Sequence, residues 1–477
     1  MGTTTLSFLG AAGTVTGSKH LLTLDAHTAT PRHILVDCGM YQGEKHLRRL
    51  NWADFPIPPS SISDVLLTHA HMDHSGMLPR LVKQGFHGRI WCTRATADLT
   101  EIILRDSAFL QERDAEYARE RGYSKHRSPE PLYRIGDVEN TLPLFRTVDF
   151  DTELDLGDAV VATWVRSGHI LGSASIHVRT DEGSVLFSGD IGRHTHPVLR
   201  PREIPPGADV VLVESTYGDR EHFEPQEPPH EVFADAIRRT IERGGSVLVP
   251  AFAVDRTEVV LHTLARMQAE GRIPRVPVFM DSPMALASLR IYQAPRNAEE
   301  LTPEVQGLAL SELDLREVRD PRQSQRLNHP EQPCIIISAS GMATGGRVLH
   351  HLETMLPDPR HTVVLTGYQA VGTRGRALVE GARHLKMYGA YVAVRAQIVR
   401  DEEFSVHADG SELVDWIAAL DPPPSHVFCV HGEPESAQAL SERLGDEVGV
   451  VAVVPTRGEH IRVRSGRIRQ VNATLNP

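Results

Sequence analysis

Three histidines and one aspartate fall within six residues, in the segment His69-Ala70-His71-Met72-Asp73-His74. The apolar run 65–68 stands directly before this segment and Ser75-Gly76 directly after it, which is typical of a buried strand that ends in a loop before a helix. Positions 69 and 71 of an extended segment share one face, and once the chain turns, positions 73 and 74 can face a second centre. Imidazole and carboxylate without thiolate suit catalytic zinc better than a structural zinc finger.

Three further residues of ligand type stand alone at the ends of apolar segments. His169 lies within 167–173, Asp190 ends the segment 188–190, and His431 follows the apolar run 426–430. A single His or Asp in such a place is normally a turn residue with satisfied hydrogen bonds. Beside the histidine-rich segment, these three complete a set of seven candidate ligands, and we expect them to meet around metal ions.

The length and the charge of the chain limit its architecture and its partners. At 477 residues it is too long for one ordinary domain and suits two. A formal net charge of −12 excludes a generally basic nucleic-acid binder, so any such surface must be a local patch. The four cysteines form no CxxC pair, and neither a signal peptide nor an apolar run long enough to span a membrane is recognisable. We therefore expect a soluble, cytoplasmic protein.

Two different patterns divide the chain. Short β-branched and aliphatic runs alternate with turns through the first 200 residues, which favours two facing sheets with helices outside. After the Pro-rich segment 201–206, strands alternate with helices such as 230–243 and 256–270, as in parallel βαβ units. We interpret the charged helical segment 101–127 as a surface excursion rather than a lid, and 295–330 as an irregular helical loop.

Taken together, these residues resemble a known superfamily. The segment 69–74, His169 and Asp190 follow one another as the motifs of the metallo-β-lactamase superfamily do, and Gly13 to Ser18 with Asp37 resembles its first motif. Segments 214–218, 404–409 and 430–433 resemble motifs A, B and C of its β-CASP branch, whose members process nucleic acids. With a histidine at motif C, this chain resembles the RNA-processing members of the branch, so His431 indicates RNA rather than DNA.

The resemblance implies an α/β fold, namely an αββα metallo-β-lactamase sandwich with an inserted parallel α/β β-CASP domain. Residues 1–216 together with 391–477 would form the discontinuous metallo-β-lactamase domain, and 217–390 the insertion. One departure stands at Asp255, where relatives usually have glycine. Because Asp is a good N-cap, we expect it to cap the helix over 256–270.

The resemblance also implies two Zn²⁺ ions as cofactors. The first zinc would take His69, His71, His169 and Asp190, and the second would take Asp73, His74, His431 and the same, bridging Asp190. A hydroxide between metals roughly 3.5–4 Å apart would attack the phosphodiester. Asp37 would orient a ligand histidine through the free N–H of its ring.

By the same resemblance, Asp73, His407 and Glu214 are the catalytic residues. His407 would protonate the leaving oxygen, since an imidazole with an unperturbed pKa of roughly 6.5 can donate a proton near neutral pH. Glu214 would pair with His407 and raise the pKa of its imidazole. Outside this context, Glu214 would be a structural turn acid and His407 a surface histidine.

Two Gly-rich loops are candidates for holding phosphate. The loop 338–347 follows an apolar strand and opens a helix, where free amides form an anion site, although a tight packing turn has the same composition. The loop 366–376 lies in a stretch, 361–400, with six Lys or Arg against one acid, which favours an RNA track over an ordinary basic face. The candidate RNA contacts are Ser338, Ser340, Gly341, Gly345, Arg374 and Arg376, with Tyr368 as a candidate for stacking a base.

We therefore predict a zinc-dependent ribonuclease, endonucleolytic or exonucleolytic, that acts in RNA processing or decay. The alternatives are a DNA nuclease, a small-molecule metallo-hydrolase, which leaves the α/β insertion unexplained, and an inactive scaffold, which would have lost metal ligands. The expected partner is single-stranded RNA, and no membrane partner is expected. A homodimer is an alternative that the sequence leaves open.

Overall fold

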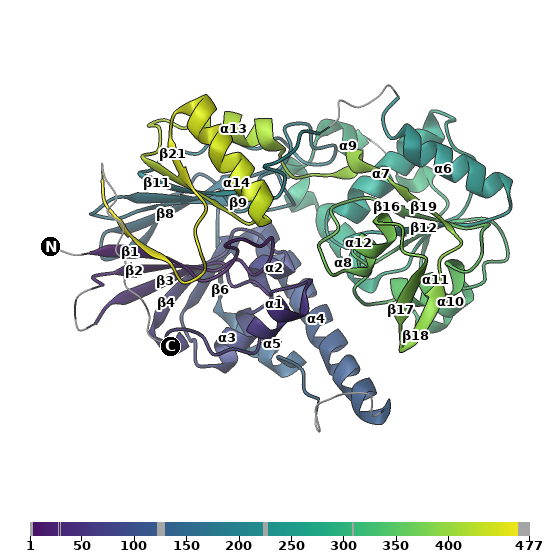
Figure 1. The fold of residues 1–477 in the computed structure, drawn as a ribbon, viewed down its shortest axis with the longest axis horizontal. Helices are drawn as coiled ribbons and strands as arrows, with labels where there is room; N and C mark the ends of the chain where they lie inside the picture. The colour runs from purple at the N-terminus through teal and green to yellow at the C-terminus, as the bar shows by residue number, and fades with distance from the viewer. Residues whose placement is uncertain are drawn as a thin grey trace.

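The chain folds into two lobes that lie side by side (Figure 1). The computed structural model describes residues 3–26, 28, 30–121, 129–222, 228–307 and 310–465. The N-terminal and C-terminal parts of the chain share one lobe, and the middle of the chain forms the other. The chain thus leaves the first lobe and returns to it, as expected for an inserted domain.

Two seven-stranded sheets make up the first lobe, in the orders β22-β1-β2-β3-β4-β5-β6 and β21-β20-β11-β10-β9-β8-β7. The strands of the first sheet are β1 (Thr4–Phe8), β2 (His20–Leu24), β3 (Arg32–Val36), β4 (Ile62–Leu66), β5 (Arg89–Thr93), β6 (Phe145–Val148) and β22 (His460–Val463). Those of the second are β7 (Leu154–Gly157), β8 (Val160–Arg166), β9 (Ala174–Arg179), β10 (Ser184–Phe187), β11 (Val210–Glu214), β20 (His426–Val430) and β21 (Val451–Val453).

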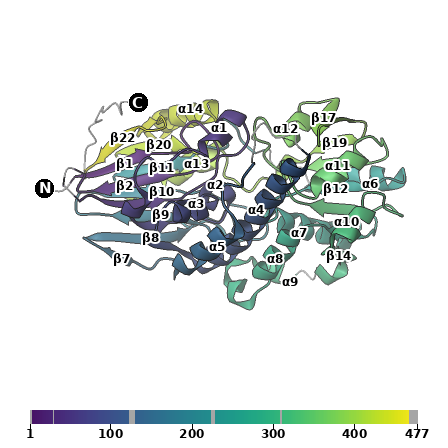
Figure 2. The same ribbon diagram turned by 90° about the horizontal axis from the view of Figure 1, so that it is seen from below.

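Successive residues of one strand face different layers of this lobe. Leu66 of β4 belongs to the core between the sheets, whereas Val65 before it faces the helices outside. Those helices are α3 (Leu78–Lys83), α4 (Arg94–Arg121) and α5 (Ile135–Thr141) on the first sheet, and α13 (Gly410–Ala418) and α14 (Pro434–Arg443) on the second (Figure 2). The layers are therefore helix, sheet, sheet, helix.

The second lobe is built on a six-stranded sheet in which all neighbouring strands are parallel, in the order β14-β13-β15-β12-β16-β19. Its strands are β12 (Val247–Pro250), β13 (Val278–Met280), β14 (Leu315–Glu317), β15 (Ile335–Ser338), β16 (Thr362–Leu365) and β19 (Gln397–Arg400). Its larger helices are α6 (Glu231–Glu242), α7 (Arg256–Ala269), α8 (Pro283–Tyr292), α11 (Val348–Met355) and α12 (Arg374–Val379). A parallel α/β insertion in an αββα sandwich is the predicted fold class, which is confirmed.

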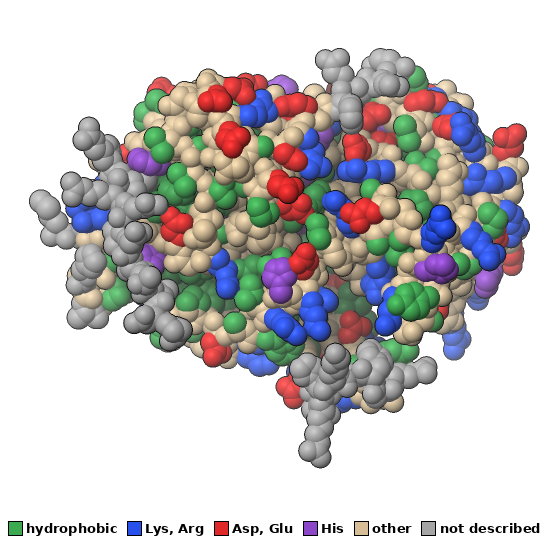
Figure 3. Space-filling model, in the orientation of Figure 1, with side chains coloured by type: hydrophobic (Ala, Val, Ile, Leu, Met, Phe, Trp, Pro, Cys, Tyr) green, Lys and Arg blue, Asp and Glu red, His purple; other side chains and the backbone are tan. Residues whose placement is uncertain are grey.

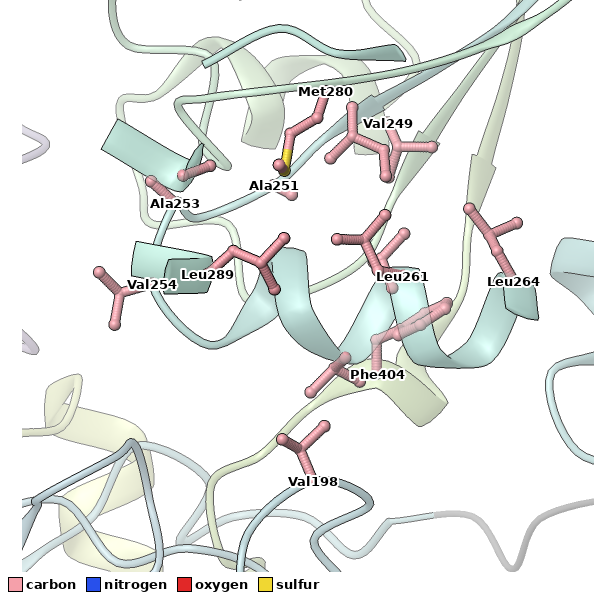
Figure 4. Close-up of a cluster of buried hydrophobic side chains, with 14 of the residues drawn as sticks. Val198, Val249, Ala251, Ala253, Val254, Leu261, Leu264, Met280, Leu289 and Phe404 are labelled. Carbon is pink, nitrogen blue, oxygen red and sulfur yellow. The ribbon is translucent and has the colours of Figure 1, made fainter. Parts of the chain in front are cut away.

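Buried side chains join the two lobes. Leu261 and Leu264 of α7 pack with Val249 and Met280 from the sheet, and Val198 of the first lobe belongs to the same cluster (Figure 4). This continuous apolar core holds the two lobes in one arrangement relative to each other.

Three predictions about elements need correction. The insertion does not end at residue 390, because β19 pairs with β16 in the parallel sheet. The segment 295–330 contains strand β14 in addition to helical turns. Helix α4 is a surface excursion only in its second half: Ile103 and Leu104 lie in buried cores, most of 109–120 is exposed, and residues 122–127 of the predicted helix lie outside the described residues.

Among the described residues, no helix combines the length and the apolar composition that crossing a bilayer requires.

Candidate metal centre and catalytic cleft

The candidate ligands follow strand ends that meet at one edge of the first lobe. Strands β8, β10, β11 and β20 run in the same direction, so the residues after them lie at the same edge. His169 follows β8, Asp190 follows β10 and His431 follows β20. The histidine-rich segment follows β4 of the facing sheet and continues into the short helix α2 (Met72–Ser75).

The seven candidate ligands form two groups, each with its ligand atoms within 4.8 Å of one another. The first group is His69, His71, His169 and Asp190, and the second is Asp73, His74 and His431. Asp190 connects them: its Oδ2 lies 3.5 Å from Nε2 of His69, and its Oδ1 lies 3.2 Å from Nε2 of His74. One carboxylate therefore faces both groups.

The distances between imidazole nitrogens show that these residues fit zinc. Nδ1 of His71 lies 3.2 Å from Nε2 of His69 and 3.2 Å from Nε2 of His169, and the Nε2 atoms of His74 and His431 are 3.1 Å apart. Nitrogens held about 2.0–2.1 Å from a tetrahedral zinc are about 3.3 Å apart. In addition, Oδ1 of Asp190 is buried without a hydrogen-bond partner among the described residues, which a cation would satisfy.

Asp37 fixes the orientation of His74. Its Oδ2 lies 2.6 Å from Nδ1 of His74, and its Oδ1 accepts a hydrogen bond of 2.9 Å from the backbone N–H of Thr68. With Nδ1 held in this way, Nε2 of His74 turns toward the second group. This is the carboxylate–histidine arrangement that orients metal ligands.

Burial sets the charge state of the first group. It lowers the pKa of His71 to about 3 and lowers the pKa of His169 well below its ordinary value, so both rings are neutral at pH 7 and their lone pairs are free for a metal. Burial also lowers the pKa of His74, but the charges of Asp190 and Asp37 outweigh it and raise that pKa well above 6.5. The two carboxylates thus favour positive charge at this position, where a metal cation would bind.

His407 and Glu214 form a pair beside the first group. Nδ1 of His407 lies 3.2 Å from Oε1 of Glu214, and the His407 ring centroid lies 4.4 Å from that of His169. Burial lowers the pKa of His407, but the charge and the hydrogen bond of Glu214 outweigh it and leave the pKa raised. The buried carboxylate thus favours the protonated form of this imidazole next to the metal ligands.

The residues predicted to contact phosphate lie in surroundings that differ from one residue to the next. Ser338 is fully buried at the end of β15 and donates to the carbonyl of Asp281, so it cannot reach a substrate. Gly341 is required for packing, because a Cβ there would meet the Phe252 ring at 2.8 Å. A Cβ on Gly345 would meet only open space. The hydroxyl of Ser340 is taken up within the loop, where it accepts from the N–H of Thr344 at 3.0 Å.

The side chains of Arg374 and Arg376 also bond to other parts of the protein. The guanidinium of Arg374 donates to the carbonyls of Lys386, Ala343 and Thr344, and Nε of Arg376 pairs with Glu380 at 2.6 Å. Tyr368 donates its hydroxyl to Glu433 at 2.5 Å. These side chains order the loop 366–376, and contact with RNA would be an additional role.

Asp255 does not cap helix α7, so that prediction is wrong. Its backbone has a φ of 67°, which favours glycine, and its side chain accepts no capping hydrogen bond. Instead, its carboxylate lies 3.2 Å from Nε2 of His196 and accepts a hydrogen bond of 3.0 Å from the hydroxyl of Tyr292. These two bonds explain an aspartate in a backbone conformation that glycine adopts more easily.

Three residues that surround His407 have no role among the predictions made from the sequence. The Tyr217 ring centroid lies 6.0 Å from that of His407, and Nε2 of His222 lies 2.8 Å from the His407 carbonyl oxygen. The third is Arg256, whose charge acts on His407. The sequence pattern does indicate a binding role for Arg256, because this residue starts a helix after strand β12, at the edge where parallel α/β sheets bind ligands.

Three family matches cover most of the chain. Residues 31–251 match the metallo-beta-lactamase superfamily, residues 257–378 match the Beta-Casp domain, and residues 391–455 match the Zn-dependent metallo-hydrolase RNA specificity domain.

Individual relatives agree with these matches. Ribonuclease TTHA0252 of Thermus thermophilus is 37% identical, with 92% of this chain and 96% of the relative covered. Transcription termination factor FttA of Pyrococcus abyssi is 30% identical, with 91% and 68% covered. The crystal structure of a protein of unknown function from Enterococcus faecalis V583 shares the fold, with a TM-score of 0.51 and 13% identity over 97% of this chain and all of that chain. The chain belongs to the β-CASP branch of the metallo-β-lactamase superfamily.

Proposed function

We propose that this chain is a zinc-dependent ribonuclease that hydrolyses phosphodiester bonds of single-stranded RNA. The observation that carries the proposal is the meeting of seven ligand side chains beside the Glu214–His407 pair. The match of residues 391–455 to an RNA specificity domain and the ribonuclease from T. thermophilus support RNA as the substrate.

The two ligand groups would hold one zinc ion each, with Asp190 shared. Zinc in such a site lowers the pKa of bound water to about 7 and neutralises charge on the phosphate. The protein contributes the fixed geometry: Asp37 holds His74, and the burial of His71 and His169 keeps their rings neutral and able to bind.

His407 would supply the proton that the leaving oxygen needs. Because Glu214 holds Nδ1 of the ring, Nε2 is the nitrogen left to donate. Glu214 is fully buried, so its negative charge is poorly screened and favours the protonated imidazole.

The path of the RNA would follow the boundary between the lobes. On the face seen in Figure 3, a hollow lies between the lobes below the centre, with basic side chains on both of its sides. Burial and the charge of Arg48, on α1 (Lys45–Leu50) of the first lobe, lower the pKa of Arg374 in the second. Positive charge from both lobes thus acts on one region, which attracts a phosphate backbone.

The experiment compares labelled RNA and DNA oligonucleotides of the same sequence, with and without a chelator, and after zinc is added back. We expect RNA to be cleaved, the chelator to stop cleavage and zinc to restore it. Preferential cleavage of DNA would identify a DNA nuclease. Cleavage of neither polymer, together with zinc-dependent hydrolysis of a thioester or lactam, would identify a small-molecule hydrolase.

A cytoplasmic location and the alternative of a homodimer stay predictions. All four cysteines are free and buried, which suits a reducing compartment. Light scattering on the purified protein measures the oligomeric state directly.

A further inference from the structure

Arg256, the first residue of α7, is a buried cation with two guanidinium nitrogens that find no partner among the described residues. Its side chain is only 6% exposed, and its Nε and Nη1 atoms have no hydrogen-bond partner among the described residues. A buried guanidinium loses its hydration, so leaving its N–H groups unpaired is costly. The missing partner is therefore expected to be an anion that binds here.

The acids around Arg256 are engaged elsewhere. Asp255 and Asp401 are the carboxylates whose charges act most on it. Asp255 is bonded to His196 and Tyr292, and Asp401 lies 3.1 Å from Nδ1 of His230. Neither forms an ion pair with Arg256 in the described part of the chain.

The guanidinium lies next to a residue of a pocket that Tyr217, a neighbour of His407, also lines. A Cβ on Gly367 would lie 2.9 Å from Nη1 of Arg256, and Gly367 lines a pocket of about 330 Å³. Tyr217, which stands next to His407, lines the same pocket. Arg193 also lines it, and its Nε is likewise buried without a partner among the described residues.

Three acids of this pocket form ion pairs with arginines, whereas Arg193 and Arg256 form no ion pair among the described residues. Glu221 pairs with Arg443, Glu231 pairs with Arg238 and Arg272, and Glu402 pairs with Arg400. The backbone N–H of His230 donates to Glu403. Arg193 and Arg256 therefore carry positive charge that no carboxylate of the described residues pairs with, which suits phosphate.

We propose that Arg256, together with the pocket beyond Tyr217, binds the RNA phosphate next to the cleaved bond on the leaving-group side. The side follows from chemistry: His407 protonates the leaving oxygen, so the departing strand begins beside His407, whose neighbour Tyr217 lines the pocket that Arg256 adjoins. This inference rests on the proposed ribonuclease function and adds a substrate-binding residue to it.

The test pairs a protein variant with a substrate variant. We compare the kcat/KM of wild type and Arg256→Gln on an RNA cleaved at one position, and on the same RNA with a neutral methylphosphonate at the adjacent linkage. The leaving-group side is identified as the product that carries the new hydroxyl. Wild type should lose about 10- to 100-fold on the neutral linkage, as expected for a charge-assisted hydrogen bond. Arg256→Gln should lose a similar factor on normal RNA and little more on the modified RNA.

The controls separate this inference from the proposed function. Arg266→Gln changes an exposed arginine of the same helix and should behave as wild type. Arg256→Lys keeps the charge and should retain part of the methylphosphonate effect, even where Gln fails to fold. If wild type cleaves RNA and both proteins lose equally on the neutral linkage, the subsite is overturned while the ribonuclease stands. If wild type cleaves no RNA, the proposed function is overturned and the subsite with it.

Discussion

Nδ1 of His407 lies 3.2 Å from Oε1 of Glu214, an oxygen that also accepts a hydrogen bond of 2.7 Å from the backbone N–H of Ile191. The carboxylate is thus fixed by the backbone, and the imidazole is fixed by the carboxylate. A general acid held in this way matters most when the leaving group is poor, because a good leaving group departs without a proton.

We therefore expect His407→Ala to slow RNA cleavage about 10²- to 10⁴-fold, the usual contribution of general acid catalysis. Hydrolysis of bis(p-nitrophenyl) phosphate should fall much less. The measurement is kcat/KM on both substrates, with His194→Ala as a control because that residue is exposed. Equal losses on both substrates would contradict the acid role.

Asp73 belongs to the second ligand group, where its Oδ2 lies 3.5 Å from Nε2 of His431. We expect Asp73→Ala to abolish hydrolysis and to reduce bound zinc from two ions to about one per chain, while RNA binding persists. Metal analysis and fluorescence anisotropy with labelled RNA measure the two effects, and Asp54→Ala serves as an exposed control. Full turnover in Asp73→Ala would rule out this carboxylate as a required ligand.

The carboxylate of Asp37 touches His74 at 2.6 Å and lies behind the metal ligands. Replacing it with asparagine keeps the shape but removes the charge that makes the His74 ring a better ligand. We expect Asp37→Asn to weaken zinc binding about 10- to 100-fold, as is typical when such a partner is lost. Competition with a chromogenic chelator measures the affinity, and unchanged affinity relative to the exposed-site variant Asp25→Asn would show that Asp37 has only a packing role.

The sequence predicted which candidate ligands come together better than it predicted the surroundings of the candidate substrate contacts, for a physical reason. The candidate ligands occur at strand ends, and strand direction places such residues at one edge even when they are far apart in sequence, as His74 and His431 are. Ser338 differs because it is the last residue within β15 rather than a residue after it, and its buried hydroxyl donates to the carbonyl of Asp281. Local sequence does not specify which neighbours cover a strand end.

The bonding of Asp255 was beyond prediction for a related reason. Its partners His196 and Tyr292 lie 59 and 37 residues away in sequence, in different lobes. Tyr292 also accepts a hydrogen bond of 3.1 Å from the N–H of Leu171, two residues after His169. Capping is a local property and could be expected from sequence, whereas this network forms only once the lobes have packed.

Glu258 of α7 provides a test of how the insertion is stabilised. The residue is 1% exposed, its Oε1 accepts from the hydroxyl of Ser288 at 2.8 Å, and its Oε2 has no hydrogen-bond partner among the described residues. Burial, with the charge of Asp255, raises the pKa of Glu258 from 4.5 to about 8. The folded protein therefore keeps this proton at neutral pH, whereas the unfolded chain does not.

Glu258 makes the folded protein less stable as the pH rises from 4.5 to 8. Below pH 4.5 both states hold the proton and Glu258 costs nothing, but between pH 4.5 and 8 only the unfolded state releases it. Stability then falls by up to about 1.4 kcal/mol per pH unit and levels off above pH 8. Glutamine has the size of the protonated side chain and does not titrate.

We therefore expect Glu258→Gln to match wild type in thermal unfolding near pH 4.5 and to be more stable at pH 8, with zinc held constant. The exposed-site variant Glu242→Gln should follow wild type at every pH, and a Glu258→Gln profile parallel to wild type would mean that the carboxyl is already ionised in the folded chain.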